Sequence, residues 1–370
     1  MAALVVCNVP LWASAGLGIS LLLTPTNLYS GFIKNGDGID LTAVANELGA
    51  YFRVNNKEVK NWVYQEAQAA QYMRTITKVK GKFPAFQSVT GNVIQGFTNV
   101  WNEIGTTTFK VNELVAYHQK VNFPIVPADV NNTWLAELDQ ENLTPAQKPI
   151  SQYIAQNELK PRVVADLEYL IGNGSYDANN LGVFGKSMNG LITILQNGIV
   201  DPNNSMYAIP CDPLTDNTIL NIVTLFERRI PMNVRNFVNK IYMSTYNKER
   251  YMLDYENQFG RFMQLSPDQA LMTRTGRRQI IGLDCLNGSD FIFATPDNNF
   301  LKLIDSFDAP QVTDIQVLDY KVKIFMEFWL GVGFWSNQMV MVSVTNGSGS
   351  GLRQDQNLFY LPGQVTPPTP

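Results

Sequence analysis

The chain has 370 residues, of which 45% are hydrophobic and 16% charged, and its formal net charge is −4. This composition is typical of a folded chain with ample core material and a thinly charged surface, which excludes intrinsic disorder and gives no bulk attraction to nucleic acid. The only histidine, His118, excludes most zinc sites and every Ser/His or Cys/His pair not built on it. Cys7, Cys211 and Cys285 are far apart in sequence, which excludes a CxxC site and is typical of a reducing compartment.

The N-terminal stretch is free of charge: residues 1–33 carry no charged side chain, and Lys34 is the first. The apolar run over residues 2–23 invites a signal-peptide or membrane interpretation. A signal peptide needs a basic n-region, which is missing here, and Asn8 and Pro10 interrupt the run before it reaches the ~20 residues of a membrane helix. We therefore expect an extended arm lying across neighbouring subunits, with a membrane segment as the alternative.

The next stretch changes from helical to extended character. Apolar residues recur at helical spacing over residues 41–73, which predicts an amphipathic helical region. Lys78, Lys80 and Lys82 then alternate with uncharged residues, which would place them on one side of a strand. We interpret this side as a solvated face in preference to a contact with nucleic acid or an acidic neighbour.

Residues 83–126 predict a long β-hairpin whose rising arm extends to Trp101 and whose arms join at residues 102–105. The returning arm alternates between a more polar face, which includes Lys110, and a less polar face. A lone hairpin is marginally stable, so one of this length needs a neighbouring surface. We therefore predict that Phe97, Trp101, Phe109 and Lys110 contact an adjacent subunit, and expect the face that carries Lys110 to be wet.

Residues 144–174 predict a long helix that organises the rest of the chain. Thr144 fits the N-cap with Gln147 completing a capping box, and Gly172 to Gly174 suit the C-terminal end. Pro161 lacks a backbone N–H, so we expect a kink or break just before it.

The following region mixes both types of structure. Residues 191–199 predict a buried strand or a short helix, residues 214–238 a helix interrupted at Pro231, and residues 241–259 a strand followed by a helix. Residues 274–278 form a basic turn, which we interpret as a solvated loop in preference to a phosphate contact.

The C-terminal region is strongly β. Residues 280–304 predict three short strands separated by turn residues, residues 315–330 one long alternating strand, and residues 339–344 a further strand. A Gly/Ser-rich stretch at residues 346–351 then leads into a Pro/Thr-rich tail that we expect to be mobile.

The order of these elements resembles that of the major capsid proteins of tailed bacteriophages, whose α+β fold is named after phage Hong Kong 97. Three stretches carry the resemblance. They are DLEYLIGNG at residues 166–174, GSDFIFATP at residues 288–296, and the hairpin ending FPIVPADV at residues 123–130. The resemblance covers nearly the whole chain and implies six regions. These are an N-terminal arm and helix (1–74), an extended β-hairpin loop (75–143), a spine helix of the peripheral domain (144–185), an axial domain (186–280), returning peripheral strands (281–345) and a tail (346–370).

The resemblance also implies a function. Such a chain is a structural protein that assembles with itself, through hexamers and pentamers, into an icosahedral head shell enclosing double-stranded DNA. Portal, scaffold or decoration proteins are possible partners, and DNA would lie non-specifically on the inner face. The resemblance implies no catalytic residue, cofactor, metal or membrane, and a location in the virion after assembly in the bacterial host cytoplasm.

Two other function classes stay open: a non-capsid assembly protein, such as a tail-tube, surface-layer or adhesive subunit, and an enzyme. The enzyme interpretation is disfavoured because His118 falls inside the predicted hairpin with no nucleophile motif beside it.

Covalent joining of subunits is a further possibility. Some capsid relatives join subunits through a loop lysine and a neighbour's asparagine, assisted by a glutamate. Lys110, Asn337 or Asn346, and Glu113 are the matching residue types here. A lysine on a wet face keeps a pKa near ~10.4 and stays protonated, so we expect a noncovalent shell.

Overall fold

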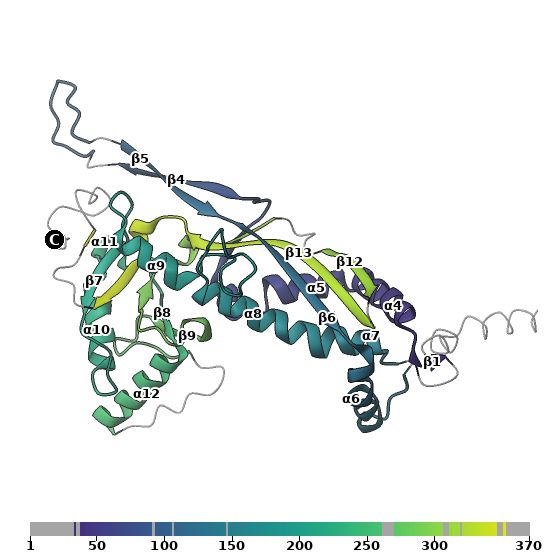
Figure 1. The fold of residues 1–370 in the computed structure, drawn as a ribbon. Helices are drawn as coiled ribbons and strands as arrows, with labels where there is room; N and C mark the ends of the chain where they lie inside the picture. Colours follow the sequence, from purple (N-terminus) through teal and green to yellow (C-terminus); the bar gives the residue numbers. More distant parts are fainter. Residues whose placement is uncertain are drawn as a thin grey trace, which may run out of the picture. The chain divides into compact units, whose positions relative to one another are not determined.

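The structure is a computed structural model of the chain. It describes residues 33–34, 38–90, 93–105, 107–145, 147–260, 270–305, 311–318, 320–345 and 351–352. The expected N-terminal arm before Ile33 and the tail beyond Leu352 lie outside the described residues. The chain divides into two compact units (Figure 1), which are described separately here. Unit 1 comprises residues 1–59, 120–163 and 311–327, and unit 2 comprises residues 60–119, 164–310 and 328–370.

Unit 1 is organised around helix α4 (Leu41–Val54). Val44, Leu48 and Phe52 recur every fourth residue and form its buried face, which contacts α7 and β12. The Asp40 side chain caps the helix by accepting hydrogen bonds from the N–H groups of Thr42 (3.0 Å) and Ala43 (3.3 Å). Its other described elements are β1 (Ile33–Lys34), β2 (Gly38–Ile39), α6 (Pro127–Gln140), α7 (Ile150–Tyr153) and β12 (Gln311–Leu318). Parts of α5 (Asn56–Tyr64), β6 (Tyr117–Ile125), α8 (Lys160–Asn173) and β13 (Lys321–Phe334) also belong to it.

Helix α6 is an element that the sequence pattern did not predict. It buries Val130, Trp134 and Leu138 on one face. The Trp134 indole N–H donates to the Lys148 carbonyl (2.9 Å), and the Lys148 ammonium in turn donates to Glu137 (2.5 Å). These contacts fix the segment between α6 and α7, so the long helix cannot begin as early as predicted.

The long helix begins at Ile150, with Pro149 as its N-cap, and not at Thr144. Thr144 and Gln147 instead close a turn in which the Gln147 side chain accepts a hydrogen bond from the Thr144 N–H (2.8 Å). The predicted break before Pro161 takes the form of a π-helical segment, η2 (Ile154–Leu159), after which α8 continues. A wider turn accommodates a proline that can neither donate a hydrogen bond nor approach the preceding carbonyl closely.

Unit 2 contains a sheet with strand order β7-β14-β10-β8-β9, covered by α10 and α12. The α12 N-terminus is capped by Ser244, whose hydroxyl accepts from Asn247 N–H (3.1 Å), and the helix ends on Gly260 in the left-handed region. The buried Asp254 carboxylate of α12 accepts from the Leu220 N–H in the first turn of α10 (2.9 Å). The bounds are β7 (Tyr207–Cys211), α10 (Ile219–Arg229), α11 (Met232–Arg235), β8 (Lys240–Ser244), α12 (Thr245–Phe259), β9 (Gln279–Leu283), β10 (Phe293–Ala294) and β14 (Met341–Thr345).

Most sequence-predicted elements of this region are confirmed. Residues 191–199 form a helix, α9 (Leu191–Val200), and the helix after residue 214 is interrupted at Pro231 as expected. The stretch from residue 241 forms β8 and then α12.

A second sheet is built around β13, which has one part in each unit. In unit 2, β11 (Phe300–Ile304) pairs antiparallel with the end of β13 and parallel with β3 (Arg74–Ile76). In unit 1, β12 pairs antiparallel with the start of β13. The prediction of one strand over residues 315–330 is therefore wrong: the chain turns at Tyr320, whose φ of 61° is in the left-handed region.

The predicted lysine strand over residues 78–82 is also wrong. Lys78 has a φ of 63°, which ends the extended conformation after β3. Lys80 pairs with Asp305 (3.2 Å) and Lys82 with Glu113 (2.6 Å), so these lysines contact acidic groups of their own chain.

Candidate assembly surface

The hairpin consists of β4 (Lys82–Thr90) and β5 (Thr107–Val115), paired antiparallel from Lys82 opposite Val115 to Thr90 opposite Thr107 (Figure 1). The predicted returning arm as far as residue 126 is wrong, because residues 117–125 form a separate strand, β6, that pairs with β13. The prediction of a rising strand as far as Trp101 is wrong, because residues 93–105 form a loop between the strands. Within this hairpin loop the Gln95 side-chain amide donates to the Asn102 carbonyl (2.5 Å). The hairpin is therefore a short ribbon with a long loop at its end.

The base of the hairpin packs on the rest of unit 2 at two glycines of β13. A Cβ added at Gly331 would lie 2.3 Å from the Val115 carbonyl oxygen, and one at Gly333 would lie 2.7 Å from a methyl of Leu114. Only residues without a side chain allow the two backbones to come this close. Behind them lies a small apolar cluster formed by Val79, Ala85, Leu114, Ala116, Leu301 and Leu303.

The more polar face of β5 is turned toward the body of unit 2. The Asn112 side chain donates to the Phe334 carbonyl (2.7 Å), and the Lys110 ammonium donates to the Asn203 carbonyl (3.4 Å). On β4, the Phe86 carbonyl accepts from the Trp335 indole N–H (3.1 Å). Partial burial lowers the pKa of Lys110, and the nearby Asp201 carboxylate opposes this shift. The expectation of a wet face and an ordinary pKa at Lys110 is therefore wrong.

The outward face of the hairpin is apolar. Phe86 and Val111 lie opposite each other in the strand register, Phe109 lies two pairs further toward the loop on the same face, and all three side chains are exposed. Apolar side chains usually face a sheet's covered side, because burying them stabilises the fold by about 25 cal/mol per Å². Here the opposite face of β5 bonds to the body of unit 2 through Asn112 and Lys110, so the apolar side chains point outward and are available to a partner.

The hairpin loop continues this apolar surface. Phe97 is 95% exposed and Trp101 is 91% exposed, close to full solvation for both rings. Of the four residues predicted to contact a neighbour, Phe97, Trp101 and Phe109 are exposed, whereas the Lys110 ammonium bonds within its own unit. Exposed apolar residues that the prediction did not single out are Phe86, Val93, Ile94, Val100, Ile104 and Val111. The density of apolar residues in this part of the sequence could have identified them.

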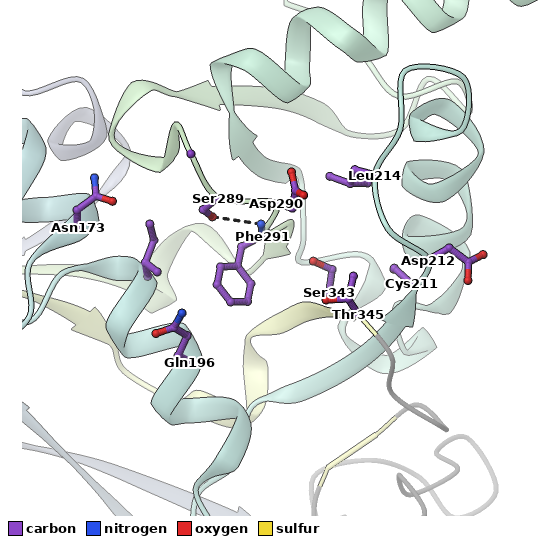
Figure 2. A pocket seen from close by; sticks show the side chains of 12 residues that line it. Asn173, Gln196, Cys211, Asp212, Leu214, Ser289, Asp290, Phe291, Ser343 and Thr345 are labelled. Carbon is purple, nitrogen blue, oxygen red and sulfur yellow. Dashed lines mark hydrogen bonds between the residues drawn. The ribbon is translucent and has the colours of Figure 1, made fainter.

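A pocket of ≈ 410 Å³ in unit 2 is a second candidate site (Figure 2). Figure 2 shows the Phe291 ring among several polar side chains. These polar groups hold the local backbone: the Ser289 hydroxyl accepts from the Phe291 N–H (3.2 Å) and the Ser343 hydroxyl from the Ile292 N–H (2.8 Å). Burial raises the pKa of the Cys211 thiol to about 11, so it is protonated and a poor nucleophile at neutral pH. The two serine hydroxyls of the pocket therefore hold the backbone, and its thiol stays protonated.

The histidine and the basic turn have structural environments. His118 lies in β6 and stacks on Trp329 with ring centroids 4.8 Å apart. Arg278 is buried against Glu227 at 2.6 Å, so a solvated loop is the wrong interpretation of that part of the basic turn. Within the described residues, no group of three or more His, Cys, Asp or Glu side chains could hold a metal ion, and no helix is long and apolar enough to cross a membrane.

Comparisons with known proteins give no match to a family model and none to a curated protein. Solved structures do match. A chain of the satellite phage P4 procapsid, which includes the size determination (Sid) protein, is 10% identical with a TM-score of 0.51 over 91% of this chain and 99% of that one. The capsid of an empty GTA particle gives 13% identity and a TM-score of 0.47, covering 75% and 89% of the two chains. The mixed helix-and-sheet fold of this chain is thus that of a phage capsid chain, and the resemblance to phage capsid proteins is confirmed for the fold.

Proposed function

We propose that this chain, having a phage capsid fold, is the major capsid protein of a tailed phage. In this proposal it has the Hong Kong 97 architecture and assembles through hexamers and pentamers into an icosahedral head around double-stranded DNA. Its role is structural and not enzymatic. The observation that carries the proposal is the apolar hairpin on a capsid-like chain, since the outward face and loop hold Phe97, Trp101 and Phe109 in water.

Burial of this surface requires a partner, which in this proposal is another copy of the chain. An exposed aromatic side chain buries roughly 150–250 Å² when covered. Obligate interfaces between subunits bury on the order of 2,000 Å² or more, so the hairpin supplies one part of a larger contact. Heterologous contacts of this kind close into rings when the rotation between copies allows it, which is what five- and six-membered capsomers require.

The regions inferred from the sequence fit into this proposal as parts of a shell subunit. Residues 75–143 would reach the neighbour, residues 144–185 would form the spine, and residues 186–280 would surround the capsomer axis. Residues 1–74 would contribute the arm, and residues 281–345 the returning strands. Portal, scaffold or decoration proteins would bind the assembled shell. DNA would contact its inner face without sequence preference, and the net charge of −4 offers no bulk attraction to it.

Electron microscopy of the expressed protein tests the proposal. We expect capsomers and closed shells in negatively stained samples, at least at some ionic strengths. Tubes or open rings without closed shells would instead identify a non-capsid assembly protein. Monodisperse monomer at every ionic strength and protein concentration would contradict both.

A deletion tests the part given to the hairpin. Removing residues 98–107 takes away most of the hairpin loop but leaves the anchoring contacts of Asn112 and Phe86 in place. We expect the circular dichroism spectrum and solubility of the body to be retained and shells to be lost. Normal shells from the deletion variant would contradict this role for the hairpin loop.

A further inference from the structure

A second exposed apolar surface lies in unit 2, on the loop that follows α8. Leu181, Val183 and Phe184 are each more than half exposed, although they lie within four residues of one another. The Phe184 ring stacks on Tyr169 of α8 with centroids 4.9 Å apart, and Tyr169 is itself 45% exposed. These four side chains are called the apolar loop patch below.

The loop that carries this patch is held by its own hydrogen bonds. Backbone N–H groups of Ser175 and Asp177 donate to the carbonyls of Gly185 (2.9 Å) and Lys186 (3.0 Å). The Asp177 carboxylate accepts from the Asn180 side chain (2.7 Å), and Gly185 takes a φ of 87° that favours glycine. The patch is therefore presented in a fixed conformation, and ordering exposed apolar side chains in water is unfavourable unless something covers them.

The hairpin loop of a second copy matches this patch in chemistry. Residues 93–105 combine several large apolar side chains with a single charged residue, Glu103, and the patch is flanked by a single basic residue, Lys186. The Lys186 side chain is half-buried in its loop and Glu103 is exposed. The same loop also carries Asp177, whose carboxylate accepts hydrogen bonds from Asn179 and Asn180. Opposite charges at the rim of an apolar contact set its register and suppress wrong partners.

We propose that the apolar loop patch is the acceptor for the hairpin loop of a neighbouring copy, with Glu103 of one copy facing Lys186 of the other. This inference rests on the proposed function and names the surface that the hairpin covers. It makes the contact heterologous, because the hairpin loop and the patch are different surfaces of the same chain. Each copy therefore gives one contact and receives one, as a ring or a shell requires.

Cysteine pairing in the assembled protein tests the inference. The background carries Cys7→Ser, and the remaining Cys211 and Cys285 are buried. We expect the double variant Ile104→Cys/Leu181→Cys to give, after oxidation of its assemblies, a ladder of multiples on a non-reducing denaturing gel. Each single variant should give monomer, and reductant should abolish the ladder. Shells without a ladder would overturn the acceptor assignment and leave the capsid function standing, whereas a background chain that forms no assembly would overturn both.

Charge reversal is an independent test of the contact between Glu103 and Lys186. It applies even if the paired cysteines prevent assembly. We expect Glu103→Lys and Lys186→Glu each to raise the protein concentration needed for assembly, and the double reversal to restore it toward the parent value. Glu249→Lys, an exposed reversal on α12, is the matched control and should change little. Additive loss in the double reversal, without rescue, would mean that the two residues face other partners.

Discussion

At the scale of single residues, the buried pair Glu227–Arg278 holds together parts of the α10 region and the basic turn. Both side chains are 3% exposed, and their charged atoms lie 2.6 Å apart. Glu227 also accepts from the Thr275 hydroxyl (2.6 Å), and Arg278 donates to the Arg235 carbonyl (2.8 Å). Since the pair is shielded from water, each ion depends on the other for compensation.

We predict that Arg278→Met lowers the free energy of unfolding by about 3–5 kcal/mol, because it leaves the Glu227 carboxylate buried without its counter-ion. Urea unfolding followed by circular dichroism measures this change. Arg277→Met is the control, because Arg277 is exposed. Equal effects at both positions would mean that the ion pair does not stabilise the fold.

Lys302 is a buried cation that bonds to carbonyl groups. Its ammonium donates to the carbonyls of Tyr64, the last residue of α5, and Ala70 (3.5 Å), and the side chain is 3% exposed. Burial lowers the pKa of Lys302 to about 8. The charged amine therefore occupies an environment that favours its neutral form.

This shift predicts how stability depends on pH. The folded-state pKa of Lys302 is about 8 and the unfolded value is ~10.4, so between these values the unfolded chain binds more protons. The contribution of Lys302 to the free energy of unfolding therefore rises with pH across that window, by on the order of 3 kcal/mol, and is lost as pH falls through 8. We expect the difference between the parent and Lys302→Met to follow this rise in unfolding experiments between pH 7 and 10. A difference independent of pH would contradict it.

At the scale of elements, the contact between the hairpin and β13 depends on glycines in β13, since a side chain there would clash with the hairpin. We predict that Gly331→Ala lowers the free energy of unfolding by about 3 kcal/mol or more, because its Cβ would lie 2.3 Å from the Val115 carbonyl oxygen. Gly49→Ala provides a contrast in sign: its Cβ would have no neighbour closer than 3.9 Å, and alanine stabilises a helix interior by about 0.5–1 kcal/mol. Thermal unfolding of both variants checks the pair. Tolerance at Gly331 would show that the hairpin does not pack on β13 in solution.

The sequence predicted those elements whose own pattern determines them. The strand followed by a helix over residues 241–259 was predicted from the apolar pattern of that stretch alone. The structure adds the helix ends, Ser244 as N-cap and Gly260 as C-cap. The turn at Tyr320 was missed because a tyrosine rarely adopts positive φ. The alternation does shift there, from odd positions such as Val317 to even positions such as Val322, and this shift was read as one strand. The start of the long helix was misplaced because Trp134 and Lys148, which fix the preceding segment, come together only in the folded chain.

The candidate site was predictable in composition but not in orientation. Phe97 and Trp101 were predicted as contact residues from their apolar side chains, and both are exposed, although they lie in the loop and not in the rising strand. The inward turn of the strand face that carries Lys110 could not be predicted, because its acceptor, the Asn203 carbonyl, lies far along the chain. The polar side chains of that face led to the prediction that it is solvated. In the folded chain, hydrogen bonds from Asn112 and Lys110 hold it against the body of unit 2.

At the scale of the whole molecule, we predict that assembled particles are held without covalent links. Since burial lowers the pKa of Lys110, protonation alone does not exclude attack by its amine. The prediction rests instead on contacts within the chain: Glu113 pairs with Lys82 on the opposite face of β5, and the Asn337 side chain donates to the Asn204 carbonyl (3.1 Å). The other candidate asparagine, Asn346, lies outside the described residues. Particles boiled in detergent should give one band near 41.5 kDa on a denaturing gel. A ladder that disappears in Lys110→Ala would prove the opposite.

The two ends of the hairpin are held by different kinds of interaction, and this gives them different thermodynamic character. Near Leu114 the base is packed in apolar contacts, whereas further out Asn112 and Lys110 rely on hydrogen bonds to carbonyls. Detaching the outer part exposes little apolar surface, so it has a small heat-capacity change and proceeds by local opening well below the global free energy. Amide hydrogen exchange along β5 should accordingly slow from Thr107 toward Val115, and a partner seated on the loop would slow it at the outer end first.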